Sequence, residues 1–156
     1  EPKIIDQVKH NGPFDRILVE ADGSARRPLK APAAHEPVVP SGSDAMIIVA
    51  GLNGIGQPLD SDHLFRPEIW QQLTDDKAGK PITARAIAQA LQHPEGLVKG
   101  CPPGAAKILF LNQADTPDRL EAARDILQQL ASTKDGQPDR AAYGTLLPSP
   151  AIAGHM

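Results

Sequence analysis

The apolar residues of this chain form short continuous runs and helix-spaced stripes, with long loops between them. Short continuous runs predict strands that are buried on both faces of a sheet, as in parallel sheets. Stripes at every third or fourth position predict amphipathic helices. Strands are expected at Arg16–Glu20, Ala45–Ala50 and Lys107–Leu111, with a weaker one at Gly144–Leu147.

Helical segments alternate with these strands. The chain opens on the expected end of a helix at Ile4–Lys9, and further helices are predicted at Pro67–Leu73, at Ala84–Gln92 and after Thr116. Thr83 and Thr116 are placed to cap the last two, and Pro117 suits a first helical position. Alternating strands and helices predict a three-layer α/β fold with a mostly parallel sheet.

Composition narrows the classes of protein. The length suits one α/β domain over residues 1–150, followed by a tail over 151–156. A net charge of −3 argues against a nucleic-acid partner, because phosphate backbones attract basic surfaces. No apolar run approaches the roughly 20 residues of a membrane span. The single cysteine, Cys101, favours a reducing compartment, so we expect a cytoplasmic protein.

Acidic residues end the first predicted strand. Glu20 and Asp22 would share one face of that strand, where two carboxylates can address a hydrated Mg²⁺ and serve catalysis. Gly23 would let the backbone approach a phosphate. A strand that ends in acidic residues is typical of the metal-binding strand of nucleotide hydrolases. The alternative is a plain Asp-Gly turn.

A second motif ends the strand at Lys107–Leu111. G-type nucleotide-binding proteins carry Asn-Lys-x-Asp at such a place, and this chain has Asn112-Gln113-Ala114-Asp115. Asn112 would tie loops together, and Asp115 would accept hydrogen bonds from a base. Gln113 stands in the lysine position, which weakens a strict preference for guanine. Alternatively, Asp115 only turns the chain ahead of the helix capped by Thr116.

The sequence contains no G-x-x-x-x-G-K-[ST] phosphate loop, which would precede the acidic strand in P-loop folds. It starts with Glu1 rather than Met, and with the end of a helix. We therefore expect the C-terminal part of a longer protein. Its fold would be of the P-loop nucleotidase type, missing its first βα unit.

Cations follow the acidic residues. Arg26 and Lys30 are candidates for binding phosphate or a cofactor anion. His35 and Glu36 are candidates for contacting a substrate or client, and Arg66 is a candidate for reaching a ligand. The alternative, that this is an ordinary solvated loop, stays open.

One further pattern extends over most of the chain. Its segments are Val19–Ser24, Pro28–Pro32, His35–Pro37, Gly51-Leu52, Phe65–Glu68, His93–Gly96, Lys99-Gly100 and Leu111–Asp115. This pattern resembles the signature of the selenium-dependent hydroxylase accessory proteins, the YqeC-like family. The resemblance is most specific over residues 19–40 and fades after Asp115.

The resemblance implies a P-loop nucleotidase fold and a role in maturing a molybdenum-containing, selenium-dependent hydroxylase. The expected ligands are Mg²⁺ with GTP or ATP, and the expected partner is the hydroxylase or its cofactor. Lys99, in its Lys-Gly segment, joins the candidate ligand-binding residues. Two alternatives remain: a non-catalytic chaperone for a molybdopterin-type cofactor, or a nucleotidyltransferase acting on that cofactor.

Overall fold

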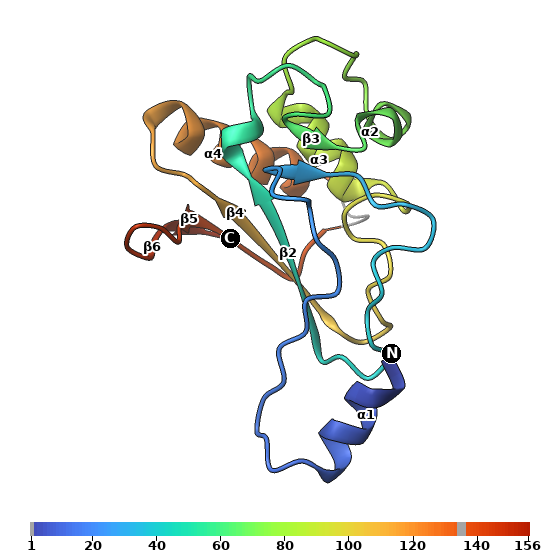
Figure 1. Ribbon diagram of the computed structural model, residues 1–156. Coiled ribbons are helices and arrows are strands. Elements are labelled where there is room, and N and C mark those ends of the chain that lie inside the picture. Colours follow the sequence, from blue (N-terminus) through green and yellow to red (C-terminus); the bar gives the residue numbers. More distant parts are fainter. Residues whose placement is uncertain (1, 134–136) are drawn as a thin grey trace.

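The protein is described by a computed structural model that covers residues 2–133 and 137–156 (Figure 1). Its main sheet has four strands in the order β2-β4-β5-β6. Their bounds are Ala45–Gly51 for β2, Ala106–Asn112 for β4, Arg140–Thr145 for β5 and Ala151–His155 for β6. The first three are parallel, and β6 is antiparallel to β5. The predicted α/β class with a mostly parallel sheet is therefore confirmed.

Four α-helices accompany the sheet within the described residues. They are α1 (Pro2–Asn11), α2 (Pro67–Leu73), α3 (Ala84–Gln92) and α4 (Pro117–Ala131). The predicted caps are confirmed, because Thr83 accepts a hydrogen bond from the Ala86 amide and Thr116 accepts one from the Arg119 amide. No helix in the described part of the chain is both long enough and apolar enough to span a membrane.

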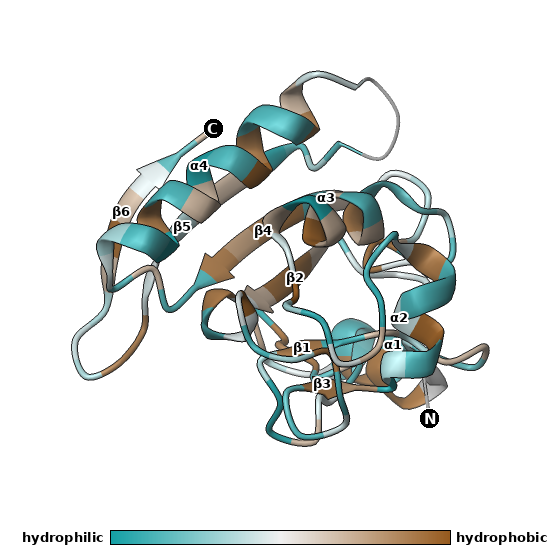
Figure 2. Cartoon of the chain, turned by 90° about the horizontal axis from the view of Figure 1, so that it is seen from above, coloured by the Kyte–Doolittle hydropathy of each residue, from teal (hydrophilic) through white to brown (hydrophobic). Residues whose placement is uncertain are grey.

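One face of the sheet is buried against α3 and α4. Cross-strand partners share a face, and the buried pairs are Ile48 with Leu109 and Ala50 with Leu111. Ile87 and Leu91 of α3 and Ile126 and Leu130 of α4 belong to the same core. In Figure 2 the hydrophobic stretches of β2 and β4 lie beside these two helices. The opposite face carries Ile47 and Val49, which are 59% and 57% exposed.

The strand predicted at Arg16–Glu20 is wrong. This segment has no regular secondary structure, and Leu18 is 92% exposed. Its apolar residues fit a strand, but a strand also needs a neighbour for its backbone hydrogen bonds. No backbone hydrogen bond joins Arg16–Glu20 to another described residue.

Three short strands were not predicted. β1 (Leu29–Lys30) and β3 (Leu64–Phe65) pair in parallel as a separate two-stranded sheet. Two residues are too few to show any periodicity, so they read as loop in the sequence. The expected tail at 151–156 instead contains β6, and the weak strand expected at Gly144–Leu147 lies earlier, as β5.

Candidate functional site: an ionic cluster beside the carboxyl ends of β2 and β4

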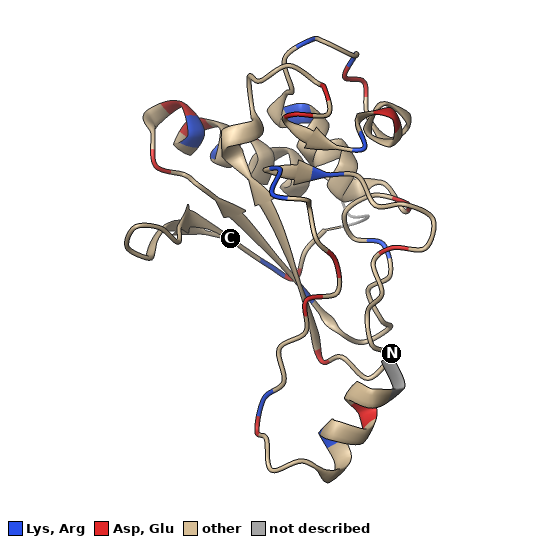
Figure 3. Ribbon diagram, viewed as in Figure 1, with Lys and Arg blue, Asp and Glu red and all other residues tan. Residues whose placement is uncertain are grey.

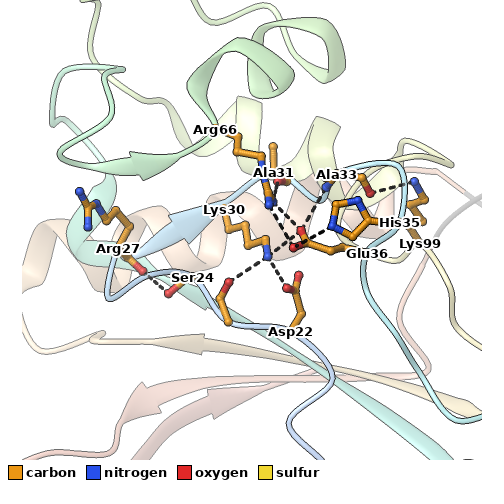
Figure 4. Close-up of polar contacts among 11 residues, drawn as sticks. Asp22, Ser24, Arg27, Lys30, Ala31, Ala33, His35, Glu36, Arg66 and Lys99 are labelled. Carbon is orange, nitrogen blue, oxygen red and sulfur yellow. Dashed lines mark hydrogen bonds and ion pairs between the residues drawn. The ribbon is translucent and has the colours of Figure 1, made fainter. Parts of the chain in front are cut away.

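Lys30 lies at the centre of an ionic cluster beside the main sheet (Figure 4). Its Nζ atom contacts Asp22 Oδ1, lies 2.8 Å from the Gly23 carbonyl oxygen, and lies 2.8 Å from Glu36 Oε2. The side chain is only 10% exposed. The three ammonium protons of Lys30 therefore have three oxygen acceptors within the protein.

Arg66 completes the cluster from the start of α2. Its two terminal nitrogens form a fork on Glu36, with Nη2 3.0 Å from Oε1 and Nη1 in close contact with Oε2. The Phe65 ring lies beneath both cations, with its centroid 4.4 Å from Arg66 Cζ and 5.3 Å from Lys30 Nζ. A bidentate, partly buried pair of this kind fixes geometry more strongly than a surface ion pair.

The pKa values of this pair reflect these contacts. The hydrogen bond from Arg66 lowers the pKa of Glu36 from 4.5 to about 2, against the opposing effect of burial, and Lys30 adds to the lowering. The pKa of Arg66 is raised in turn by its hydrogen bond to Glu36. Glu36 is therefore ionised at neutral pH and holds two cations.

The loop that carries His35 is hydrogen-bonded to this cluster. The amide of Ala33 donates to Glu36 Oε2 at 3.2 Å. On the other side, Lys99 Nζ donates to the carbonyl oxygens of Ala33 and Ala34, both at 3.2 Å, and pairs with Glu95 at 2.8 Å. The loop that carries His35 is thus held from both sides.

These contacts bear on three candidate ligand residues. Lys30 was predicted to bind phosphate or a cofactor anion, and Arg66 and Lys99 to contact a ligand; here each uses its donors on carboxylates or carbonyl oxygens of this chain. Around β1, basic residues lie close to acidic ones rather than in a patch of one sign (Figure 3). Their role in the described structure is to position the loop.

His35 projects from the fastened loop. Its side chain is 77% exposed, and Nε2 lies 3.8 Å from Glu36 Oε1. The predicted pair of His35 and Glu36 is therefore split: the Glu36 side chain is partly buried on Lys30 and Arg66, while the His35 side chain is mostly exposed.

The acidic end of the segment is only partly as predicted. Asp22 reaches the cluster, but Glu20 lies in the exposed irregular segment, so the two carboxylates do not share a strand face. Among the described residues no group of three metal-ligating side chains is present. Arg26 is exposed, adopts a left-handed conformation with φ 64°, and its side chain makes no hydrogen bond or ion pair with a described residue.

The second motif lies where β4 ends. Asn112 Oδ1 accepts a hydrogen bond from the Gln113 amide at 2.8 Å, a contact between neighbouring residues of the same loop. Gln113 has φ 65°, and its Oε1 is buried without a hydrogen-bond partner in the described structure. Asp115 Oδ1 accepts from Arg119 Nη1 at 2.5 Å, so part of this carboxylate is already engaged.

Gly51 lies between the β4 motif and the chain that leads into β1. It ends β2, its amide donates to the Pro28 carbonyl oxygen at 2.9 Å, and it is the cross-strand neighbour of Asn112. A Cβ atom at this position would lie 2.7 Å from Gln113 Oε1 and 2.8 Å from the Pro28 oxygen. The chain that leads into β1 and the Gln113 side chain therefore meet at the end of β2.

One polar residue near this place was missed by the sequence analysis. Asn53, just after β2, has a buried Oδ1 atom that, like Gln113 Oε1, has no hydrogen-bond partner among the described residues. Buried acceptors of this kind are uncommon in folded proteins. The Gly51-Leu52-Asn53 sequence beside a strand end was the available signal.

Comparison with known proteins bears on the resemblance. A family model described as "YqeC protein" matches residues 1–68. A curated relative, "Uncharacterized protein YqeC" of Escherichia coli strain K12, is 32% identical over 132 residues. The chain is YqeC-like. The match covers 83% of this chain and 50% of the relative, so the chain spans about half the length of that YqeC protein. No solved structure matches.

The region matched by the YqeC model contains most of the ionic cluster. Asp22, Lys30, Glu36 and Arg66 all lie within residues 1–68, whereas Asn112–Asp115 lies beyond them. The ionic cluster is therefore inside the YqeC-matched region, and the β4 motif is outside it.

The lowered pKa of Glu36 predicts an acid-sensitive stability. The contribution of Glu36 is complete above the ordinary pKa of 4.5 and is lost as the pH falls toward about 2. We expect the free energy of unfolding to fall through this window by up to about 3 kcal/mol more in the wild type than in Glu36→Gln. Urea unfolding at a series of pH values measures this difference. Parallel curves for the two proteins would contradict it.

Proposed function

We propose that this chain is part of a YqeC-like accessory protein that binds a nucleoside triphosphate with Mg²⁺ and hydrolyses it while a selenium-dependent molybdenum hydroxylase matures. The observation that supports this is the meeting of the Pro28 and Gln113 segments at Gly51, beside the carboxyl ends of two parallel strands. In open α/β sheets this edge is where ligands bind. The proposed complete fold is a three-layer P-loop nucleotidase fold whose first βα unit is outside this chain.

Asp22 and Glu20 are the proposed Mg²⁺ ligands. Mg²⁺ in nucleotide sites keeps several waters and needs only one or two carboxylates besides the phosphates, so a cluster of three protein ligands is not required. Lys30 engages one oxygen of Asp22, Oδ1, and Oδ2 has no hydrogen-bond partner within the described residues. The oxygen atoms of Asp22, Gly23 and Glu36 already surround the positive charge of the Lys30 ammonium group. When bound, Mg²⁺ would neutralise charge on the phosphates.

Asp115 and Asn112 are the proposed base-binding residues. Guanine offers two donors to a carboxylate, whereas adenine presents an acceptor at N1 and would leave the carboxylate poorly paired. Arg119 holds Oδ1 of Asp115, and Gln113 replaces a lysine stem. Both features reduce discrimination, so we expect a preference for GTP over ATP on the order of tenfold, about 1.4 kcal/mol.

Substitution of Asp22 tests the proposed chemistry. In the full-length protein, Asp22→Asn should lower the rate of Mg²⁺-dependent phosphate release from GTP on the order of 100-fold, because one metal ligand loses its charge. Asp15→Asn, in the same exposed segment, is the matched control and should retain full activity. Equal rates for Asp22→Asn and the wild type would reject Asp22 as a metal ligand.

One observation favours the second candidate, a non-catalytic chaperone. Lys30, Arg66 and Lys99 are paired within the protein, which leaves fewer cations to stabilise a phosphoryl transition state. A chaperone would bind nucleotide or molybdopterin-type cofactor without turnover. Product analysis in the same assay separates the cases: free phosphate indicates hydrolysis, pyrophosphate indicates nucleotidyl transfer, and neither product indicates binding alone.

A further inference from the structure

The outer edge of β2 is an unpaired strand edge (Figure 1). β2 is the first strand of the sheet and pairs only with β4 among the described strands. Its sequence, Ala-Met-Ile-Ile-Val-Ala-Gly, contains no charge and no proline. Natural proteins usually protect such edges with charges, prolines, bulges or a covering segment. β2 has the composition of an interior strand of a parallel sheet.

The hydrogen bonds show which backbone groups face outward. The Ala106 amide donates to the Asp44 carbonyl oxygen. The backbone N–H and C=O groups of Asp44 and of every second residue after it, including Ile48, therefore point toward β4. The backbone N–H and C=O groups of the intervening residues, including Ile47 and Val49, therefore point away from β4. The Gly51 amide follows this alternation, because it donates outward to Pro28 at 2.9 Å. It makes the one backbone hydrogen bond on this side to a described residue.

The side chains of these outward-pointing residues are also uncovered. Ile47 and Val49 lie on the sheet face opposite to α3 and α4, and each residue is more than half exposed. Two alternate β-branched residues, Ile47 and Val49, with both free backbone groups and exposed side chains match the requirements of an added strand.

We propose that the outer edge of β2 binds a parallel, apolar β-strand of the same polypeptide from outside residues 1–156. The curated relative is about twice as long as the matched region, which leaves ample chain to supply such a strand. Parallel pairing continues the direction of β2, β4 and β5. A two-fold pairing of β2 with β2 of a second copy would be antiparallel instead. The inference rests on the fold named in the proposed function, in which part of the sheet lies outside this chain, and does not depend on nucleotide binding or hydrolysis.

Amide hydrogen exchange on the polypeptide as its gene encodes it tests the pairing within one strand. The inward amide of Ile48 is the internal reference, since β4 protects it in every case. If the edge is paired, the outward amides of Ile47 and Val49 exchange within about tenfold of Ile48. Exchange of both outward amides more than about 100-fold faster than Ile48 would overturn the proposal.

Two further readouts separate the remaining outcomes. Protection that disappears on dilution, together with a doubled mass, would overturn the proposal in favour of pairing between two copies. Ile47→Pro removes only an outward amide, so it should be tolerated at a free edge but lower the Tm of the encoded polypeptide if the edge is paired. Protected outward amides in a protein that binds no nucleotide would retain this inference and reject the proposed function.

Discussion

Glu36→Ala is expected to lower the free energy of unfolding by about 2–4 kcal/mol. The substitution leaves the Arg66 guanidinium without its carboxylate, and Lys30 loses one of its three oxygens. Both cations are mostly removed from solvent, so water replaces the lost partner only in part. The value lies below that of a fully buried pair because Arg66 keeps some exposure. Urea unfolding at neutral pH measures the loss.

Two variants give this prediction a control. Glu95→Ala removes a carboxylate at the same 2.8 Å distance from a lysine, but Glu95 is mostly exposed, so the loss should be far smaller. Glu36→Gln keeps an acceptor for Arg66 and should recover part of the stability. If Glu36→Ala is no more harmful than Glu95→Ala, the cluster does not hold the loop.

Gly51→Ala is expected to cost about 1–3 kcal/mol, although the backbone there suits any residue, with φ −85° and ψ 115°. The added methyl group would lie 2.8 Å from the Pro28 carbonyl oxygen and 3.0 Å from Pro28 Cα. The Gln113 side chain can move away from it, but the Pro28 backbone is held by its hydrogen bond to Gly51. Urea unfolding measures the change, and GTP affinity should fall with it.

Gly23→Ala is the matched control for Gly51→Ala. A methyl group at Gly23 would meet only Glu20 Oε1, at an ordinary 3.7 Å. We expect a change within about 0.5 kcal/mol, as for most surface substitutions. If both alanine variants behave alike, the segments at Pro28 and Gln113 do not meet at the end of β2.

Local sequence signals predicted the helices well. α2 and α3 have the predicted bounds, and Thr83 and Thr116 cap their helices, because a cap depends on residues within one turn. β2 and β4 were also predicted within a residue or two, since each is a continuous apolar run.

The features that the sequence did not predict depend on partners that are distant in the sequence. Arg16–Glu20 has the composition of a strand, but pairing decides whether a strand forms, and no described segment pairs with it. Lys30 and Arg66 were selected as ligand-binding cations, and the structure pairs both with Glu36. Glu36 and Arg66 are separated by 30 positions, and no local pattern distinguishes a cation that meets a carboxylate from one that meets a phosphate.

Calorimetric titration of GTP with Mg²⁺ into the polypeptide as its gene encodes it tests the central proposal most directly. The account predicts binding that is about tenfold tighter for GTP than for ATP. Asp115→Asn should remove this preference and favour XTP, whereas Asp118→Asn, in the first turn of α4, should leave it unchanged. No binding of any nucleotide, or an Asp115→Asn variant that discriminates as the wild type does, would contradict a nucleotide site at the ends of β2 and β4.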